Sequence, residues 1–209
     1  MALQSKSKLL RKDCYMYHVT QKNDRSPGIF VDAVVASLFI KLMVENLKKE
    51  GILVWNYSIM PTHYHLLVYA PSWQILARAL QRINTSFSQS FPELAVDGRI
   101  FSTRPKYEPI TTQFTLLNLM TYIFRNPRKI CYWKNYWKSG AWEYTLKQLT
   151  VINPQGLDKH MGITIEQLME IVDSTINYDD KHFEVLTKVC LEHPVPSSLF
   201  CCSNPDTEQ

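Results

Sequence analysis

The sequence predicts an α+β fold of the ferredoxin-like, split βαβ type, with one further helix and a small helical appendage. Strand-type and helix-type hydrophobic patterns succeed one another along residues 12–126 in the order strand, helix, strand, strand, helix, strand, helix. The first six elements have the order of a split βαβ unit, which is built around a central antiparallel sheet. After residue 148 the remaining patterns are short, acidic and helical.

The first two elements are a strand and a helix. Aromatic and β-branched residues dominate Lys12–Gln21, and a polar loop with Pro27 and Gly28 follows, which predicts a strand that ends near residue 21. Apolar residues then recur at helical spacing over Val31–Lys49, and Gly51 stands where a helix would end.

Two neighbouring strands and a second helix come next. Gly51–Met60 and His63–Ala70 read as strands, and they should pair because only two residues separate them. Trp73–Phe91 has apolar residues at helical spacing and Ser72 as its cap.

The last part of the split unit is short and rich in proline. Residues 100–110 predict one or two strands, which Pro105 and Pro109 restrict to the edge of a sheet. A third helix is expected over Thr112–Asn126, because Pro127 prevents its continuation.

Charge divides the chain into two parts. Residues 1–150 contain 20 Lys and Arg against 9 Asp and Glu, whereas residues 151–209 contain 3 against 10. The first part suits a polyanionic partner and the second does not, although such charges can also simply solvate helix faces. Charge and pattern together divide the chain into a basic N-terminal segment (1–11), an α+β domain (12–147), and an acidic helical appendage with a tail (148–209).

The appendage contains two expected helices, at Thr164–Ile176 and Lys181–Leu191. It could pack on the α+β domain, form a homodimer, or cover a nucleic-acid site as an anionic mimic. The sequence favours packing, since that is the usual use of an amphipathic helix.

Several classes of protein are excluded by composition. The five cysteines show no CxxC spacing, which argues against a disulfide framework and a cysteine zinc site. No apolar run reaches the roughly 18 residues that a membrane helix needs, and the first twenty residues lack a signal-peptide core. We expect a cytoplasmic, nucleoid-associated protein with no membrane partner.

The sharpest local motif is His63-Tyr64-His65. Strand side chains alternate between faces, so the two imidazoles should project from the same face and could converge on one metal ion. Two histidines make only half a metal site, and this spacing also occurs by chance.

The third helix adds polar groups of the right kind. On a helical wheel Arg125 and Asn126 fall near Tyr122, and the core face lies opposite that tyrosine. The predicted core face consists of Leu116, Leu117, Met120, Ile123 and Phe124. A phenol can attack phosphorus, an amide oxygen can ligate a hard cation, and a guanidinium can hold a phosphate. Alternatively, Tyr122 is an ordinary half-buried helical tyrosine.

Three blocks of sequence together resemble one family. These blocks are Tyr17-His18-Val19-Thr20-Gln21 with its Asn-Asp-Arg loop, Met60-Pro61-Thr62-His63-Tyr64-His65-Leu66-Leu67, and Tyr122-Ile123-Phe124-Arg125-Asn126-Pro127. In order and spacing they are similar to the signature blocks of the REP-associated tyrosine transposases, which belong to the HUH single-strand DNA transposases. The resemblance covers roughly residues 12–147 and implies that they form the catalytic domain.

The resemblance implies roles for individual residues. His63 and His65 match the paired metal ligands, Tyr122 matches the nucleophile, and Asn126 matches the polar residue that completes the coordination of Mg²⁺ or Mn²⁺. Residues 100–106 match a DNA-contact block in part, with Ser102 and Pro105 in place of the usual Gln and aromatic residue. The candidate DNA contacts are Arg25, Arg104, Lys106, Arg125, Arg128 and Lys129.

The implied activity is transposition by cleavage and rejoining of single-stranded DNA at REP-like hairpins through a 5′-phosphotyrosine. Two other interpretations stay open at this point. The protein could be a hairpin-binding factor with little endonuclease activity, or a metal-dependent hydrolase in which the two histidines bind zinc.

Overall fold

The structure, a computed structural model, describes residues 15–23, 25–131, 133–175 and 180–200. The basic segment 1–11 lies outside these ranges, as does the end of the tail. No helix within them is both long enough and apolar enough to cross a membrane.

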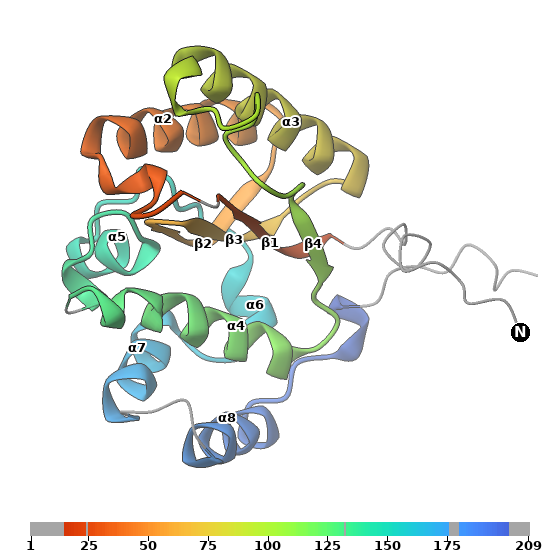
Figure 1. The fold of residues 1–209 in the computed structure, drawn as a ribbon. Coiled ribbons are helices and arrows are strands. Elements are labelled where there is room, and N and C mark those ends of the chain that lie inside the picture. Colours follow the sequence, from red (N-terminus) through yellow and green to blue (C-terminus); the bar gives the residue numbers. More distant parts are fainter. Residues whose placement is uncertain (1–14, 24, 132, 176–179, 201–209) are drawn as a thin grey trace, which may run out of the picture.

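A four-stranded antiparallel sheet forms the centre of the protein (Figure 1). Its strands lie in the order β2-β3-β1-β4. The predicted α+β, ferredoxin-like fold is thereby confirmed, and β4 lies at an edge, as its prolines required. The strands are β1 (Met16–Lys22), β2 (Leu53–Met60), β3 (His63–Tyr69) and β4 (Lys106–Pro109).

Two helices, α2 (Ala33–Lys49) and α3 (Trp73–Ser90), cover one face of the sheet (Figure 1). Asp32 caps the first helix and the predicted Ser72 caps the second. Aromatic side chains fill the space between these helices and the sheet. They include Phe30, Phe39, Tyr64, Phe87 and Phe101, with neighbouring rings 4.9–6.3 Å apart.

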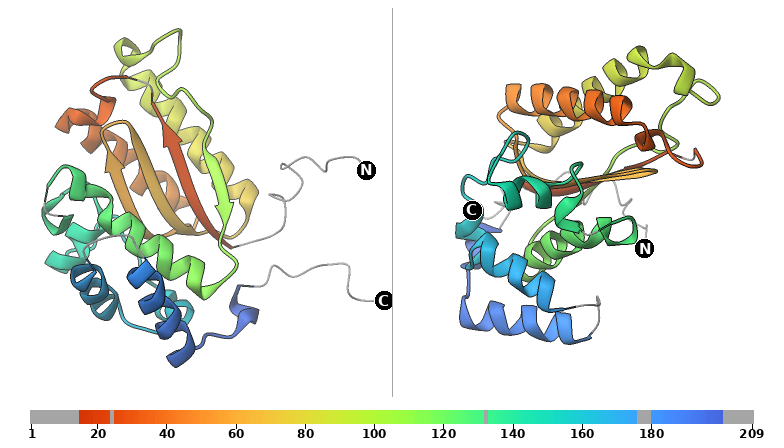
Figure 2. Two further views of the ribbon diagram at one scale, coloured as in Figure 1. Left: turned by 60° about the horizontal axis from the view of Figure 1, so that its bottom comes forward. Right: turned by 90° about the vertical axis from the view of Figure 1, so that its left-hand side faces the viewer.

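The other face carries α4 (Gln113–Arg125) and the C-terminal helices, as the edge-on view in Figure 2 shows. Thr112 caps α4 by accepting a hydrogen bond from the Thr115 amide. Sequence patterns missed α5 and α6, which are too short to show periodicity. The other elements on this face are α5 (Gly140–Leu146), α6 (Leu157–Met161), α7 (Ile165–Ser174) and α8 (Asp180–Glu192).

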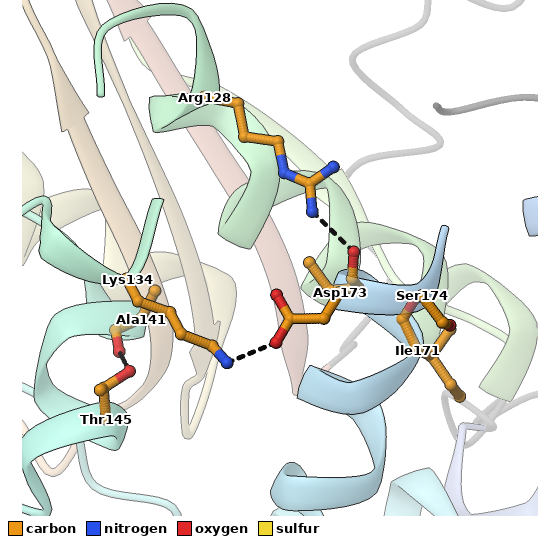
Figure 3. A network of polar contacts seen from close by, with 8 residues as sticks. Arg128, Lys134, Ala141, Thr145, Ile171, Asp173 and Ser174 are labelled. Carbon is orange, nitrogen blue, oxygen red and sulfur yellow. Dashed lines mark hydrogen bonds and ion pairs between the residues drawn. The ribbon is translucent and has the colours of Figure 1, made fainter. Parts of the chain in front are cut away.

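The acidic appendage packs on the outer side of α4. Leu168 and Val172 of α7 and Leu186 of α8 share a core with the apolar face of α4. Figure 3 shows the end of α7, where Lys134 forms an ion pair with Asp173 and Arg128 approaches the helix carbonyls. Of the three uses considered for the appendage, packing is thus seen directly.

Candidate active site

Polar side chains gather on the α4 side of the sheet, at one end of three adjacent strands. The register pairs Lys22 with His63, and Thr20 with both His65 and Lys106. Directly opposite residues in an antiparallel pair point to the same face. Two lysines and two histidines therefore share one face near the start of β3.

His63 and His65 lie side by side on that face, as their spacing predicted. Their rings are 5.0 Å apart and nearly perpendicular. Tyr64, between them, points into the aromatic core on the opposite face and is fully buried. His63 Nδ1 lies 3.1 Å from the Thr62 hydroxyl.

The tight turn before His63 is held by the loop after β1. The amides of Asn23 and Phe30 donate to the carbonyls of Thr62 and Pro61, at 2.8 and 3.2 Å. Gly28 has φ +110°, and a Cβ on it would lie 2.2 Å from the Pro61 carbonyl oxygen. Only glycine fits there, so the loop can close on the turn and fix the start of β3.

His18 and Glu108 complete a chain of contacts that the sequence did not reveal. His18 Nε2 lies 2.9 Å from His65 Nδ1, and His18 Nδ1 lies 3.2 Å from a Glu108 carboxylate oxygen. Burial lowers the pKa of His18 below its usual value, although Glu108 opposes this shift. Burial lowers the pKa of His65 to about 3, and so does the repulsion that His18, His63 and Lys22 exert on it when they are protonated. His65 is therefore a neutral imidazole at physiological pH.

Tyr122 of α4 faces this cluster. Its ring meets the His65 ring edge to face, with centroids 5.3 Å apart, and 36% of the residue is exposed. The helical wheel placed its core face correctly, since every residue predicted for that face is buried. These residues are Leu116, Leu117, Met120, Ile123 and Phe124.

Two buried polar atoms of the predicted site residues have no hydrogen-bond partner within the described residues: His65 Nε2 and Asn126 Nδ2. Asn126 follows Tyr122 by one helical turn and donates its amide to the Tyr122 carbonyl. Side-chain amide orientation is an assignment, so the oxygen and the nitrogen of the Asn126 amide can exchange places. An amide oxygen is a donor that suits Mg²⁺ or Mn²⁺, whereas an imidazole lone pair suits transition-metal ions.

The donor set would be sparse. Among the described residues, no three His, Cys, Asp or Glu side chains gather as a metal cluster. A cation here would thus rely on His63, His65 and Asn126, with its other positions open to water or a substrate oxygen.

Basic residues surround the same end of the sheet. Arg104 and Lys106 are exposed. Arg25 lines a surface hollow of about 430 Å³ together with Arg99 and Ser102, and Arg99 was not singled out from the sequence. The Ser102 amide donates to the Lys22 carbonyl, which places the hollow near the end of β1. The side chain of Lys129 lies outside the described part of the chain.

The expectation that Arg125 shares the exposed face of Tyr122 is wrong. Arg125 is 9% exposed, and its guanidinium donates to the Thr175 carbonyl at 3.0 Å and contacts His182 Nδ1 at 3.1 Å. Arg128 donates to the Val172 carbonyl at 2.7 Å. Both arginines neutralise the carbonyl end of α7, and each would have to leave it in order to contact DNA.

Gln21, the last residue of the Tyr17–Gln21 block, connects several elements of the fold by hydrogen bonds. Its Oε1 accepts hydrogen bonds from the Tyr64 hydroxyl at 2.7 Å and from Asn84 at 3.0 Å, while its amide donates to the Thr103 carbonyl at 2.8 Å. This side chain ties β1, β3 and α3 to the loop that carries Arg104.

Comparison with known proteins yields matches in structure alone. No protein-family model matches the sequence, and no curated protein matches it. A REP-associated tyrosine transposase bound to a REP hairpin superposes with a TM-score of 0.56 at 11% identity, over 72% of this chain and 90% of that one. A candidate transposase from Deinococcus radiodurans R1 matches with a TM-score of 0.41 at 19% identity, over 53% and 88%. The chain has the fold of a REP-associated tyrosine transposase.

Proposed function

We propose that this protein is a transposase that cleaves and rejoins single-stranded DNA at hairpin sites through a covalent bond to Tyr122. The observation that carries the proposal is the arrangement of Tyr122 against His65, with ring centroids 5.3 Å apart, together with the buried His65 Nε2, which has no partner among the described residues. Buried polar groups are nearly always hydrogen-bonded, so such atoms are candidates for ligand contact.

In the proposed reaction the Tyr122 hydroxyl oxygen attacks the scissile phosphorus. The new bond joins Tyr122 to the 5′-phosphate, the P–O3′ bond breaks, and the 3′-oxygen leaves as a hydroxyl with the proton that the phenol loses. Attack by another 3′-hydroxyl reverses these steps at a new junction. No water or nucleotide is consumed.

The histidines would orient the phosphate. His63 and His65 would hold Mg²⁺ or Mn²⁺ with Asn126, and a bound divalent ion supplies Lewis-acid polarisation of a phosphoryl oxygen. Because His65 is buried and neutral, its lone pair is available to a cation without loss of a proton. The edge-to-face contact with His65 limits the orientations of the Tyr122 ring.

The surrounding charges support a polyanionic substrate. Lys22 and Lys106 flank the histidines on one face, and Arg25 and Arg104 lie near the same end of the sheet. Phosphate contacts of this kind release counterions and make binding strongly salt-dependent. The hollow beside Arg25 has room for an unpaired nucleotide next to the hairpin stem.

Covalent capture tests the proposal. Hairpin oligonucleotides from the flanks of the gene, labelled at the 3′ end, are incubated with Mn²⁺ and the protein and then separated under denaturing conditions. We expect a labelled protein band that Tyr122→Phe and EDTA abolish. Tyr15→Phe is the matched control, since Tyr15 has similar exposure, 41%, and stacks on Tyr69 at 5.7 Å, away from the histidines.

Each other outcome favours one of the remaining interpretations. Hairpin binding with neither cleavage nor adduct would contradict the proposal and identify a binding factor. Metal-dependent cleavage that leaves a free 5′-phosphate would identify a hydrolase. An adduct that still forms with Tyr122→Phe would show that another residue is the nucleophile.

A further inference from the structure

Three side chains from three adjacent strands form a directed chain of contacts. Glu108 of β4 contacts His18 Nδ1 at 3.2 Å, and His18 Nε2 contacts His65 Nδ1 of β3 at 2.9 Å. The two imidazole planes lie within 6° of parallel, and both histidines are buried. The chain ends at His65 Nε2, which is buried and has no partner among the described residues.

The chemistry of the groups sets the direction of these hydrogen bonds. A carboxylate can only accept, so His18 Nδ1 carries the hydrogen and donates it to Glu108. A neutral imidazole has one N–H, so His18 Nε2 accepts, and the donor to it must be His65 Nδ1. His65 Nε2 then has a lone pair and no hydrogen.

The opposite tautomer is disfavoured by the same contacts. If His65 carried its hydrogen on Nε2, its Nδ1 would accept from His18 Nε2. His18 Nδ1 would then turn a lone pair toward the Glu108 carboxylate, and the contact at 3.2 Å would become repulsive. The opposite tautomer would also place a donor N–H at the one nitrogen of His65 that is left to bind a cation.

We propose that His18 and Glu108 are positioning residues, which hold His65 in the tautomer protonated at Nδ1 and so keep the Nε2 lone pair ready for a ligand. The inference rests on the proposed function for the identity of that ligand, a divalent cation beside the scissile phosphate. Histidine ligands commonly depend on such a partner behind the ring, which fixes tautomer and orientation and raises basicity.

Nitrogen NMR of the metal-free wild-type protein tests the tautomer directly. Long-range ¹H–¹⁵N correlation distinguishes a protonated from an unprotonated imidazole nitrogen, and His65→Gln identifies the signals of His65. Two other histidines are internal references. His160 Nδ1 contacts the Gly156 carbonyl at 2.8 Å and must be protonated there, whereas His182 Nδ1 faces the donor Arg125 and must accept.

We expect His65 to show the pattern of His160, with hydrogen on Nδ1. The pattern of His182 would overturn the proposal. This measurement uses neither metal nor DNA, so its outcome is separate from that of covalent capture. An adduct with the wrong tautomer refutes only the positioning role, and the right tautomer with no adduct refutes only the proposed activity.

Substitution of His18 provides a second test of the positioning role. His18→Phe removes the acceptor and keeps a ring, and we expect His65 to lose its preference for Nδ1–H and Mn²⁺ affinity, measured by calorimetry, to fall by about 10- to 100-fold. His18→Gln is the conservative rescue, because its amide oxygen can accept from His65 Nδ1. Circular dichroism checks the fold of both variants. Unchanged tautomer and unchanged Mn²⁺ affinity in a folded His18→Phe protein would overturn the proposal.

Discussion

The two faces of β3 are surrounded by different kinds of side chain. Tyr64, Leu66 and Val68 point into the α2–α3 layer and are fully buried among aromatic and aliphatic side chains. His63 and His65 point to the α4 side, where lysines and a histidine are their neighbours. One strand thus forms part of a packed core on one face and the candidate active site on the other.

This difference shows how one strand can be held by an apolar core on one face and present histidines on the other. The α2–α3 face supplies apolar burial, which is the main favourable term in folding. The α4 side can then keep His65 Nε2 buried without a partner among the described residues, at a cost in stability of the kind that functional sites tolerate. Substitutions on the two faces should therefore separate stability from activity.

The largest effect on stability is expected from Phe39→Ala on the α2–α3 side. Phe39 is fully buried and contacts four aromatic rings at 4.9–6.0 Å. We expect the free energy of unfolding to fall by about 3–5 kcal/mol, since truncation leaves a cavity. Chemical denaturation measures the change. A loss below about 1 kcal/mol would mean that this layer is not the main source of stability.

A smaller loss is expected from Gly28→Ala, which acts on the junction between the two faces. The new Cβ would collide with the Pro61 carbonyl, and φ +110° with ψ 148° is a conformation open essentially to glycine. We expect a loss of about 2–3 kcal/mol, together with a lower yield of covalent adduct as the start of β3 shifts.

Gly51→Ala is the matched control for that variant. Gly51 also has positive φ, +67°, but its Cβ would meet nothing within 4 Å. Its cost should be limited to about 1–2 kcal/mol of backbone strain, with adduct yield unchanged. Equal effects of the two substitutions would contradict the role given to the close contact with Pro61.

Arg125→Met tests whether this arginine serves the fold or the substrate. The substitution removes the Arg125 donor from His182 Nδ1 and from the Thr175 carbonyl, which keeps a longer contact with Arg128 at 3.4 Å, so we expect a loss of about 2 kcal/mol in thermal or chemical unfolding. Arg82→Met, which removes a surface ion pair with Glu50, should cost at most about 1 kcal/mol. A stable Arg125→Met protein with weakened DNA binding would instead support the predicted contact of Arg125 with DNA.

The smallest change in stability is expected from Lys106→Met on the histidine face. The side chain is exposed, so the free energy of unfolding should stay within about 0.5 kcal/mol of wild type. Hairpin affinity measured against salt concentration should lose about one unit of slope, as expected for one phosphate contact. Lys41→Met on α2, which removes an exposed i,i+4 pair, should leave that slope unchanged.

Local sequence patterns were sufficient to predict which faces of β3 and α4 carry the residues of the candidate site. Alternation along β3 correctly placed His63 and His65 on one face and Tyr64 on the other. The helical wheel correctly placed the core side of α4. Each conclusion depends only on the period of one element, which a sequence states directly.

Contacts between segments far apart in the sequence could not be predicted from local patterns. Arg125 looked solvent-exposed because a wheel cannot show that residues 50 or more positions later cover that side of the helix. The contact between His18 and Glu108 depends on the register of β1 with β4, and a four-residue edge strand gives no pattern to fix it. A histidine at an inward-facing position of a predicted strand was the one available signal.

A helix that lies on a sheet can still roll about its own long axis, and a roll of one residue would turn a side chain by about 100°. His182 bridges Thr121 and Arg125, one turn apart on α4, at 3.1 Å each. Gln113 at the other end of the helix bonds to the carbonyls of Met161 and His193. The C-terminal helices therefore fix the rotational phase of α4, and with it the direction in which Tyr122 reaches.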